Sequence, residues 1–446
     1  MLKKQEVWSS KLNFILATTG AAVGLGNIWK FSYMAGSNGG SAFVIVYLLC
    51  ILIIGIPLMI GEMLIGYMGK SDTVSSLETL AKKYKKSHCW KYLGWLGCFT
   101  LLLVLSFYSV VAGWSLYYIK TSLIHSLTNT IEIQNTWQNL MQQPLLMLIY
   151  HSVFMFLTLI IVRKGIKQGV EKASRVMMPA LFFILIILVG YASSTNGFDA
   201  GIDFLFHFDF SKITPTVAIS ALGHACFTLA IGAGCILTYG AYLPKDSKIV
   251  STVFIITFLD VLVAIFSGMA IFPLVFSYNL IPTSGPGLMF QTLPIAFAKM
   301  GGGYWFGLLF FVLLLFAALT STISIAEPLV ALLIKRFNFS RTKACIGIGL
   351  LAWLLGILTI LSFNELSQFK PFFSKDLFSL ITDSATNILL PVGILGFGIF
   401  VSLNIPKTKL EIALNNPKKQ LFNLWYYTLK YISPVAILII LIEGIL

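Results

Sequence analysis

A stretch near the start of the chain, GAAVGLGNIWKF from Gly20 to Phe31, combines residues that open a helix with residues that bind ions. It lies in an apolar run at about 12–35 that is long enough to cross a bilayer. Backbone groups freed by a break in a membrane helix are tolerated only where protein or a water-filled cavity receives them. The unpaired amides of a half-helix N-terminus also attract an anion. We therefore expect a binding site in this stretch.

Polar residues inside other apolar runs indicate further chemistry at membrane depth. Glu62 and Asp260 are buried acids, which are costly unless they are paired or lie beside a cation. We expect Glu62 to accept hydrogen bonds from an opened backbone near Gly232, a structural role. We interpret His224 and Glu327 as satisfied polar residues at helix contacts, with proton counter-transport as the alternative.

The composition of the chain is that of an integral membrane protein. Its 446 residues have a mean hydropathy of +0.88, and only 11% are charged. No polar linker divides the chain, so we expect one polytopic domain over residues 1–446. The net charge of +14 lies in short loops, which indicates membrane orientation rather than nucleic-acid binding. The six cysteines show neither metal spacing nor an extracellular pair, so no disulfide framework is expected.

Apolar runs near twenty residues predict eleven transmembrane helices and an all-α fold. Most Lys and Arg residues fall on one side of these spans, which places the N-terminus in the cytoplasm and the C-terminus outside. The short loops and termini suggest a bacterial inner membrane. The spans are expected at about 12–35, 41–68, 92–119, 144–162, 176–195, 215–242, 249–277, 303–334, 344–363, 377–403 and 424–446.

Glycines interrupt the first and the sixth span in the same way, with Gly24 and Gly26 in one and Gly232 and Gly234 in the other. Each of these spans opens a block of five, and because five is odd the second block must be inverted. Paired broken helices at matching positions of inverted repeats indicate a transporter with a site near the membrane midplane. The alternative is that these glycines only allow close helix packing. We expect repeats at about 12–195 and 215–403, followed by one extra helix at 424–446.

Four motifs carry a resemblance to the neurotransmitter:sodium symporter family, and most of all to its bacterial eleven-span amino acid transporters. They are GAAVGLGNIWKF, the following NGGSAFVIVY, IGIPLMIGEMLIG in the second span and FAALTSTISIAEP in the eighth. The resemblance covers essentially the whole chain. It implies a five-plus-five inverted repeat with discontinuous helices 1 and 6, sodium-coupled uptake and alternating access.

The resemblance places a substrate carboxylate against Leu25 and Gly26, beside the hydroxyl of Tyr108. Family members that carry amines without a carboxylate have an aspartate where this chain has Gly24, so we expect a substrate that supplies its own carboxylate. Small residues such as Ala233 favour large aliphatic or aromatic side chains and leave a charged one unpaired. The expected substrate-binding residues are Ala21, Ala22, Gly24, Leu25, Gly26, Val104, Tyr108, Phe227, Thr228, Ala230, Ala233, Ser321 and Ile325.

Two sodium sites follow from the same resemblance and from the preference of hard cations for oxygen ligands. The first would use Ala22, Asn27, Thr228 and Asp260, together with the substrate carboxylate. The second would use Gly20, Val23, Ala317, Thr320 and Ser321. In isolation, the hydroxyls of the Thr320–Ser321 pair could simply bond to the preceding helical turn. Asp260 is expected to replace chloride, so that transport does not require this anion.

The expected gates depart from the family pattern. Lys30 stands where the family commonly has arginine, and its partner would be Asp383, one residue from the usual register. Lysine lacks the planar fork of arginine, so this gate should be looser. On the inner side the family's arginine and aspartate correspond to Gln5 and Lys335, which leaves Trp8 as a plug.

Inner closure was expected to need other contacts, with Lys3 and Lys4 as candidates. The spacing of Gly169 and Pro179 in the fifth span resembles that of relatives in which this helix unwinds to release sodium. Proline removes a helical hydrogen bond and glycine weakens the preceding turn. A kink without functional consequence is the alternative.

The sequence thus predicts a sodium-coupled secondary active symporter that imports an amino acid. The alternatives are a membrane sensor that binds an amino acid, or a symporter for another small zwitterion. A channel is disfavoured by the occluding residues Trp8, Tyr108 and Phe227. An enzyme is excluded because no nucleophile, base and oxyanion donors stand out. The expected partners are the amino acid, sodium ions and membrane lipid, without nucleic acid, and the oligomeric state stays open.

Overall fold

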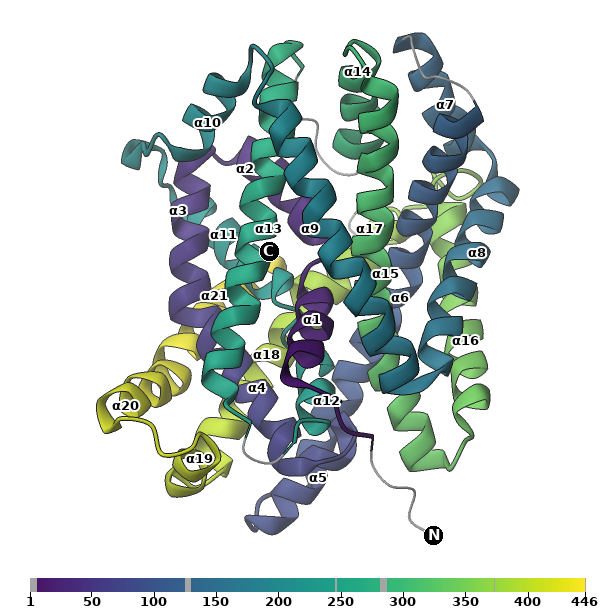
Figure 1. Ribbon diagram of the computed structural model, residues 1–446. Coiled ribbons are helices and arrows are strands. Elements are labelled where there is room, and N and C mark those ends of the chain that lie inside the picture. Colours follow the sequence, from purple (N-terminus) through teal and green to yellow (C-terminus); the bar gives the residue numbers. More distant parts are fainter. Residues whose placement is uncertain (1–5, 125–129, 245–246, 281–286, 373, 446) are drawn as a thin grey trace.

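The computed structural model describes residues 6–124, 130–244, 247–280, 287–372 and 374–445, and these residues fold into a bundle of helices (Figure 1). No strand forms among the described residues, where one isolated bridge joins Phe372 and Lys375. This confirms the predicted all-α fold. The first residues that the structure describes lie at the same end of the bundle as α5 (Thr73–Lys83) in Figure 1, and we call this the inner end. The opposite end is the outer end.

Nine helices in the described part of the chain are long and apolar enough to cross a membrane. A tenth crossing forms if α1 (Lys11–Ala22) and the following helical segment Gly26–Ser37 count together, since a bend of 54° separates them. The exact number of eleven spans stays a prediction. The nine are Ser41–Gly69, His88–Ile124, Pro144–Arg163, Ile166–Ala192, Ile249–Ser277, Gly303–Phe337, Arg341–Ser362, Leu377–Asn404 and Lys419–Gly444.

The first predicted break occurs where α1 ends. Val23 adopts an extended conformation, and a π-helical turn over Gly26–Lys30 leads into α2 (Phe31–Ser37). A Cβ atom at Gly24 would lie 2.5 Å from the Ser321 hydroxyl and 2.6 Å from the Tyr108 hydroxyl, so a side chain there would require these neighbours to shift. Glycine therefore fits the opened backbone without a rearrangement of Ser321 and Tyr108.

The second break divides the predicted sixth span into α11 (Pro215–Thr228) and α12 (Cys235–Ala241). Thr214 caps α11 by accepting a hydrogen bond from the Val217 amide. Between the two helices Gly232 has φ +94° and Gly234 has φ +93°, a left-handed conformation that glycine adopts without strain. Both predicted discontinuities are thus present, whereas the inverted relation of the two halves stays a prediction.

The helices that position the site surround α1, which lies near the middle of the bundle (Figure 1). α1 contacts α15 (Gly303–Phe337), α13 (Ile249–Ser277) and α9 (Lys172–Ala192). α15 in turn packs along α6 (Lys91–Ile124). The remaining helices cover this group and carry apolar side chains outward.

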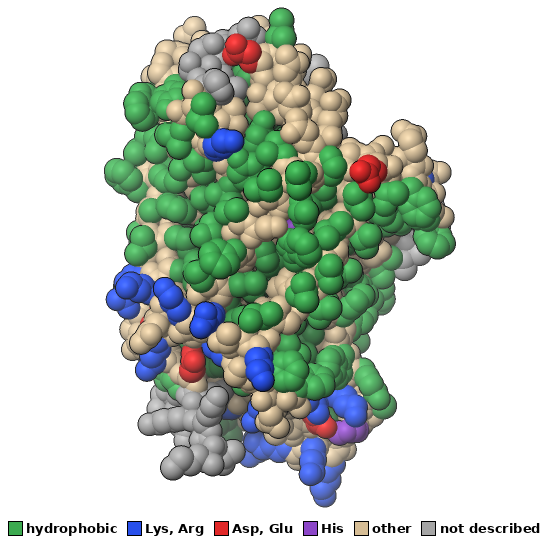
Figure 2. All heavy atoms as spheres, turned by 90° about the vertical axis from the view of Figure 1, so that its right-hand side faces the viewer, with side chains coloured by type: hydrophobic (Ala, Val, Ile, Leu, Met, Phe, Trp, Pro, Cys, Tyr) green, Lys and Arg blue, Asp and Glu red, His purple; other side chains and the backbone are tan. Residues whose placement is uncertain are grey.

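The remaining elements complete the bundle or its two ends. The further α-helices are α3 (Ser41–Cys50), α4 (Ile56–Gly69), α7 (Thr130–Gln142), α8 (Pro144–Arg163), α10 (Phe198–Phe206), α14 (Leu293–Ala298), α16 (Arg341–Ser362), α17 (Leu377–Asp383), α18 (Leu390–Ile399), α19 (Lys407–Ala413), α20 (Lys419–Tyr427) and α21 (Ser433–Ile445). Figure 2 shows hydrophobic side chains over the middle of one face and Lys and Arg gathered toward the inner end. The positive-inside rule expects this distribution when the inner end faces the cytoplasm.

Candidate ion and substrate sites

A cavity of about 60 Å³ lies between the two broken helices. Leu101, Ile231, Cys235 and Leu390 line it as well, although the sequence did not single them out. Of the predicted substrate residues, Leu25 lies elsewhere, on the wall of a larger cavity at the outer end. The other predicted residues line the small cavity, namely Ala21, Ala22, Gly24, Gly26, Val104, Tyr108, Phe227, Thr228, Ala230, Ala233, Ser321 and Ile325.

The polar end of this cavity is built on the opened backbone of helix 1. The Leu25 amide donates a 2.8 Å hydrogen bond to the Tyr108 hydroxyl. The Gly24 amide donates to Oδ1 of Asn27 at 3.0 Å. Because the Tyr108 hydroxyl oxygen accepts from the Leu25 amide, the hydroxyl proton can be donated to another acceptor. A carboxylate placed here would meet a hydroxyl donor beside the dipole of a half-helix N-terminus.

The predicted first sodium site contains a buried carboxylate with polar oxygens around it. Thr228 donates to both oxygens of Asp260, at 3.1 and 3.2 Å. Asn27 Nδ2 donates to Asp260 Oδ1 at 2.7 Å and to its backbone carbonyl at 3.1 Å. All three residues are at most 2% exposed. This oxygen-rich donor set fits a hard cation, which would satisfy the carboxylate in place of these bonds.

The predicted second sodium site lies where α1 packs against α15. Ser321 bonds across the contact, because its hydroxyl donates to the carbonyls of Val23 at 3.1 Å and Gly20 at 3.4 Å. Thr320 instead bonds to its own helix, donating to Ala317 at 3.0 Å and to the preceding turn. The alternative, that these hydroxyls simply bond to the preceding turn of their own helix, therefore applies to Thr320 but not to Ser321. The five predicted residues lie along this contact between α1 and α15. They supply carbonyl and hydroxyl oxygens of the type that sodium binds.

Glu62 on α4 (Ile56–Gly69) has the structural role that the sequence predicted. Its carboxylate accepts hydrogen bonds from the amides of Gly232 at 2.6 Å, Gly234 at 3.1 Å and Leu237 at 3.4 Å. The side chain is 2% exposed. It therefore satisfies the amides that the break between α11 and α12 leaves without helical partners.

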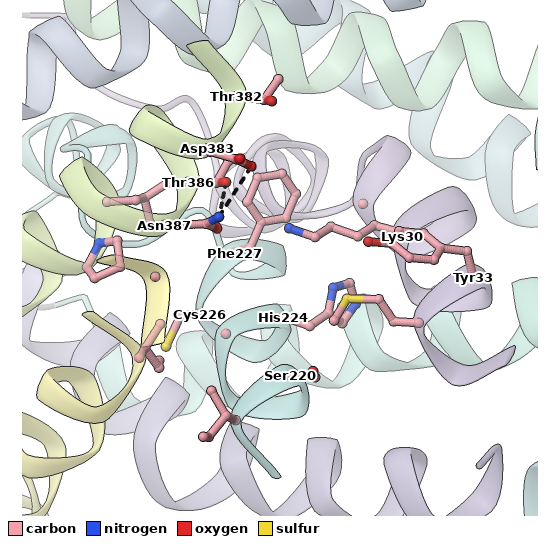
Figure 3. Close-up of a pocket in the computed structure, with 18 of the residues that line it drawn as sticks. Lys30, Tyr33, Ser220, His224, Cys226, Phe227, Thr382, Asp383, Thr386 and Asn387 are labelled. Atoms are coloured by element: carbon pink, nitrogen blue, oxygen red, sulfur yellow. Dashed lines mark hydrogen bonds between the residues drawn. The ribbon is translucent and has the colours of Figure 1, made fainter. Parts of the chain in front are cut away.

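At the outer end, a cavity of about 450 Å³ reaches down to Phe227, which separates it from the smaller one. The ammonium group of Lys30 lies 4.2 Å from the centre of the Phe227 ring. Asp383 bonds instead to Lys375 at 2.5 Å and to the Asn387 amide at 3.3 Å. Figure 3 shows Lys30 and Asp383 approaching Phe227 from opposite sides of the cavity. In this conformation the predicted Lys30–Asp383 gate is not engaged, and its pairing stays a prediction for the closed state.

At the inner end, Trp8 is buried in the bundle, and its role as a plug stays a prediction. Its indole is 3% exposed and donates to the Tyr239 carbonyl at 3.1 Å, while its amide donates to the Tyr242 carbonyl at 3.3 Å. The candidates Lys3 and Lys4 lie outside the described residues, as does Gln5, so their part in inner closure stays a prediction, and Lys335 is exposed.

Two carboxylates fasten the N-terminal segment to the start of the fifth span. Glu171 accepts from the Ser9 amide at 2.7 Å, from the Ser9 hydroxyl and from Asn13 Nδ2 at 2.9 Å. Glu6 accepts from the Ile166 amide at 2.6 Å. Sequence reasoning missed this network, and its only signal was polar Asn13 inside an apolar span.

A third carboxylate joins several helices at the inner end. Glu327 on α15 forms an ion pair with Arg341, and Tyr242 donates to it at 3.2 Å. Arg341 also donates to the Val162 carbonyl at 2.8 Å. Glu327 is therefore a satisfied polar residue, as predicted. The same interpretation is wrong for His224, because neither ring nitrogen has a hydrogen-bond partner.

The predicted unwinding element already departs from α-helical geometry. Gly169 lies in a π-helical turn, Ile166–Glu171, and a Cβ atom on it would approach the Ile161 carbonyl oxygen to 2.1 Å. Pro179 lies inside the following helix α9. Glu171 belongs to the same π-helical turn, so the N-terminal plug is bonded directly to this element. Whether it unwinds in the transport cycle stays a prediction.

Two interrupted helices that meet around a buried cavity, beside oxygen-rich clusters, define a secondary transporter of the membrane. A model of the sodium:neurotransmitter symporter family matches residues 5–143 and 146–446. The chain belongs to the sodium:neurotransmitter symporter family, and it is a sodium-dependent transporter rather than an enzyme.

Relatives and a solved structure agree with this assignment. The chain is 38% identical over 446 residues to the uncharacterized sodium-dependent transporter YhdH of Bacillus subtilis, covering 99% of this chain and 98% of the relative. It is 33% identical to an uncharacterized sodium-dependent transporter of Haemophilus influenzae, with 99% of both covered. The crystal structure of MhsT in complex with L-phenylalanine matches with a TM-score of 0.92 at 37% identity, covering 99% of this chain and 100% of the other.

Proposed function

We propose that the protein imports an amino acid with a free carboxylate, together with sodium, by alternating access, and that large hydrophobic or aromatic side chains are preferred. The observation that carries this proposal is the space around Gly24. Any side chain there would collide with the hydroxyls of Ser321 and Tyr108. The protein thus has no room for a carboxylate of its own at this point, and the substrate must bring one.

The rest of the small cavity supports an apolar substrate side chain. Val104, Ala230, Ala233 and Ile325 offer no charged partner, so a charged side chain would be buried without compensation. The likeness to MhsT, whose structure contains L-phenylalanine, supports an aromatic substrate. Because the cavity measures about 60 Å³, we infer that Phe227 and its neighbours move to admit such a ligand.

We place two sodium ions at the sites described above. The first would lie between Asp260, Asn27 and Thr228, close to the substrate carboxylate. An ion and a substrate that share a ligand each favour the binding of the other, and this coupling is reciprocal. The second ion would hold α1 against α15 through Ser321. Asp260 supplies a fixed negative charge beside the first ion, so chloride is not required.

A thermal-shift screen of the purified protein against the twenty amino acids, with and without sodium, tests the proposal directly. Ligands that bind the native state stabilise it by mass action, so stabilisation should require both sodium and a hydrophobic amino acid. A preference for glycine or alanine over tryptophan, phenylalanine and leucine would show that the substrate size is wrong. Exchange of labelled substrate across proteoliposomes separates a transporter from a sensor, which binds without flux.

The chloride proposal has its own test. Uptake into proteoliposomes should be unchanged when chloride is replaced by gluconate on both sides. In Asp260→Asn, the fixed charge is lost while the size is kept, and uptake should collapse in gluconate. An absolute chloride requirement in the unmodified protein would refute the proposal.

A further inference from the structure

His224 on α11 is buried without any hydrogen bond. Its side chain is 1% exposed, and both ring nitrogens lack a partner. A neutral imidazole carries one donor and one acceptor, and a buried polar group left unpaired is destabilising. A state in which a nitrogen of His224 gains a partner would therefore be favoured.

The surroundings of the imidazole explain why its nitrogens are unsatisfied here. The ring packs against Phe31 at 5.9 Å, Phe43 at 5.9 Å and Tyr47 at 5.3 Å between centroids. The rings of phenylalanine offer no conventional hydrogen bond, and no hydrogen bond joins the Tyr47 hydroxyl to His224 in the described structure. The remaining side faces the outer cavity, which His224 helps to line.

Lys30, a cation of the same cavity, forms no ion pair among the described residues. Its ammonium lies over the Phe227 ring, while Asp383 is held by Lys375 and Asn387. Lys30 and His224 both line the outer cavity. In Figure 3 the Lys30 side chain crosses the cavity above His224 and ends beside Phe227.

Helix geometry links His224 to the ring that Lys30 now covers. His224 and Phe227 are three residues apart on α11, so they lie on neighbouring positions of one helix face. A tilt of α11 that carries Phe227 over the substrate cavity moves His224 with it. The same motion displaces the ring on which the Lys30 ammonium rests, and this ammonium then needs a new partner.

We propose that His224 is a positioning residue of the outer gate, which accepts a hydrogen bond from Lys30 when the cavity closes over the substrate. The proposal rests on transport by alternating access. The ammonium of lysine has three donors but no planar fork, so it can bridge two acceptors placed apart. His224 supplies one acceptor from α11, and Asp383 supplies the other from α17. The imidazole thereby compensates for the lysine that replaces arginine.

A double-mutant cycle on substrate release tests this pairing. His224→Phe keeps the aromatic packing but removes both nitrogens, and Lys30→Met removes the donor. With L-phenylalanine and saturating sodium, we expect His224→Phe to release the labelled ligand about tenfold faster, the equivalent of one hydrogen bond to a charged group. Lys30→Met also removes the bond to Asp383 and should be at least as fast, and the double variant should release the ligand no faster than Lys30→Met alone. Independent, multiplying effects would overturn the proposal.

Two further variants exclude a merely structural effect. His224→Gln retains an acceptor and should release the ligand within about twofold of the unmodified rate. His151 on α8 is another buried histidine with an unpartnered Nδ1, and it does not line the outer cavity. His151→Gln should leave the rate unchanged. If His224→Gln were as fast as His224→Phe, hydrogen bonding would not be the cause.

A second measurement, which requires no amino acid, tests the role of His224 independently of the proposed substrate. Ser220→Cys places a thiol on the wall of the outer cavity. Its labelling by a membrane-impermeant thiol reagent should rise in the His224→Phe background relative to the unmodified gate. If L-phenylalanine does not bind at all, the proposed substrate is wrong, and the labelling ratio still decides the role of His224. Equal labelling would overturn that role.

Discussion

The outer end contains a cavity of about 450 Å³ lined by Lys30 and Asp383. These two residues do not form an ion pair with each other, because Asp383 pairs with Lys375. The inner end contains Trp8 at 3% exposure, held by a hydrogen bond to α12, and the bonded carboxylates of Glu6, Glu171 and Glu327 lie at the same end. This arrangement is the one expected of an outward-open state if the protein works by the alternating access that we propose. The two gates also differ in chemistry.

The difference indicates how the inner end can stay closed without the arginine–aspartate ion pair that is common in the family. In the proposed outer gate, Lys30 and Asp383 have to move before they can pair. Lysine also lacks the planar fork with which arginine fixes the geometry of such a pair. At the inner end, Glu6 and Glu171 accept hydrogen bonds from backbone amides, a hydroxyl and a side-chain amide without a cation partner, and Glu327 forms an ion pair with Arg341. Hydrogen bonds of this kind are strong because the acceptor is charged. We infer that closure of the inner end is the more costly to undo. Four substitutions test this comparison.

The largest effect is expected from Glu327→Gln at the inner end. The change leaves the Arg341 cation, 20% exposed, without its buried anion, and loss of one partner of such a pair costs about 3 kcal/mol. Thermal unfolding in detergent should show a clear fall in Tm. Glu78→Gln is the matched control, because Glu78 pairs with Arg336 at the surface and should contribute less than about 1 kcal/mol. Equal shifts for the two variants would remove the contrast between buried and exposed pairs.

Glu171→Gln should loosen the N-terminal plug without affecting the outer end. Hydrogen bonds to a charged acceptor contribute roughly 1.5–3 kcal/mol, so protection of the amides in residues 9–15 should fall about 10–100-fold. Hydrogen exchange followed by mass spectrometry measures this directly. Lys172→Gln changes an exposed neighbour and serves as the control. A similar loss of protection in α11 would mean that the two ends are not separate gates.

Phe227→Leu should weaken the outer gate by a smaller amount. The cation–π contact with Lys30 contributes about 1 kcal/mol, so bound L-phenylalanine should dissociate about fivefold faster in sodium. Phe107→Leu is the comparison, since Phe107 also lines the outer cavity but packs against Phe378. If both variants behave alike, the lysine contact contributes nothing to closure.

Lys375→Met should have the smallest effect. Its pair with Asp383 is 45% and 37% exposed, and such pairs contribute at most about 1 kcal/mol. Freeing Asp383 for Lys30 should slow ligand dissociation by about twofold, and added salt should erase the difference. Lys370→Met, another lysine of the same segment, provides the control. Faster dissociation would show that Lys375 assists the gate rather than competing for it.

The sequence by itself determined the class of fold and the place of the site. Long apolar runs have to cross a membrane as helices, because no other open backbone is satisfied there. Gly24, Gly232 and Gly234 marked the two breaks because Gly24 leaves room for the hydroxyls of Ser321 and Tyr108, and because Gly232 and Gly234 adopt positive φ angles. Glu62 could be assigned to the second break because a buried acid needs donors, and an opened helix supplies them.

The tertiary structure alone decided which side chains meet. Glu171 and Ser9 are 162 positions apart, so no local pattern indicates their bond. Lys30 could face Asp383 or Phe227 from the same place in the sequence, and the state of the outer cavity selects between them. His224 looked like an ordinary helix contact until its neighbours proved unable to bond to it. Periodicity fixes the helices and their breaks locally, whereas the partners of polar groups depend on how distant helices pack.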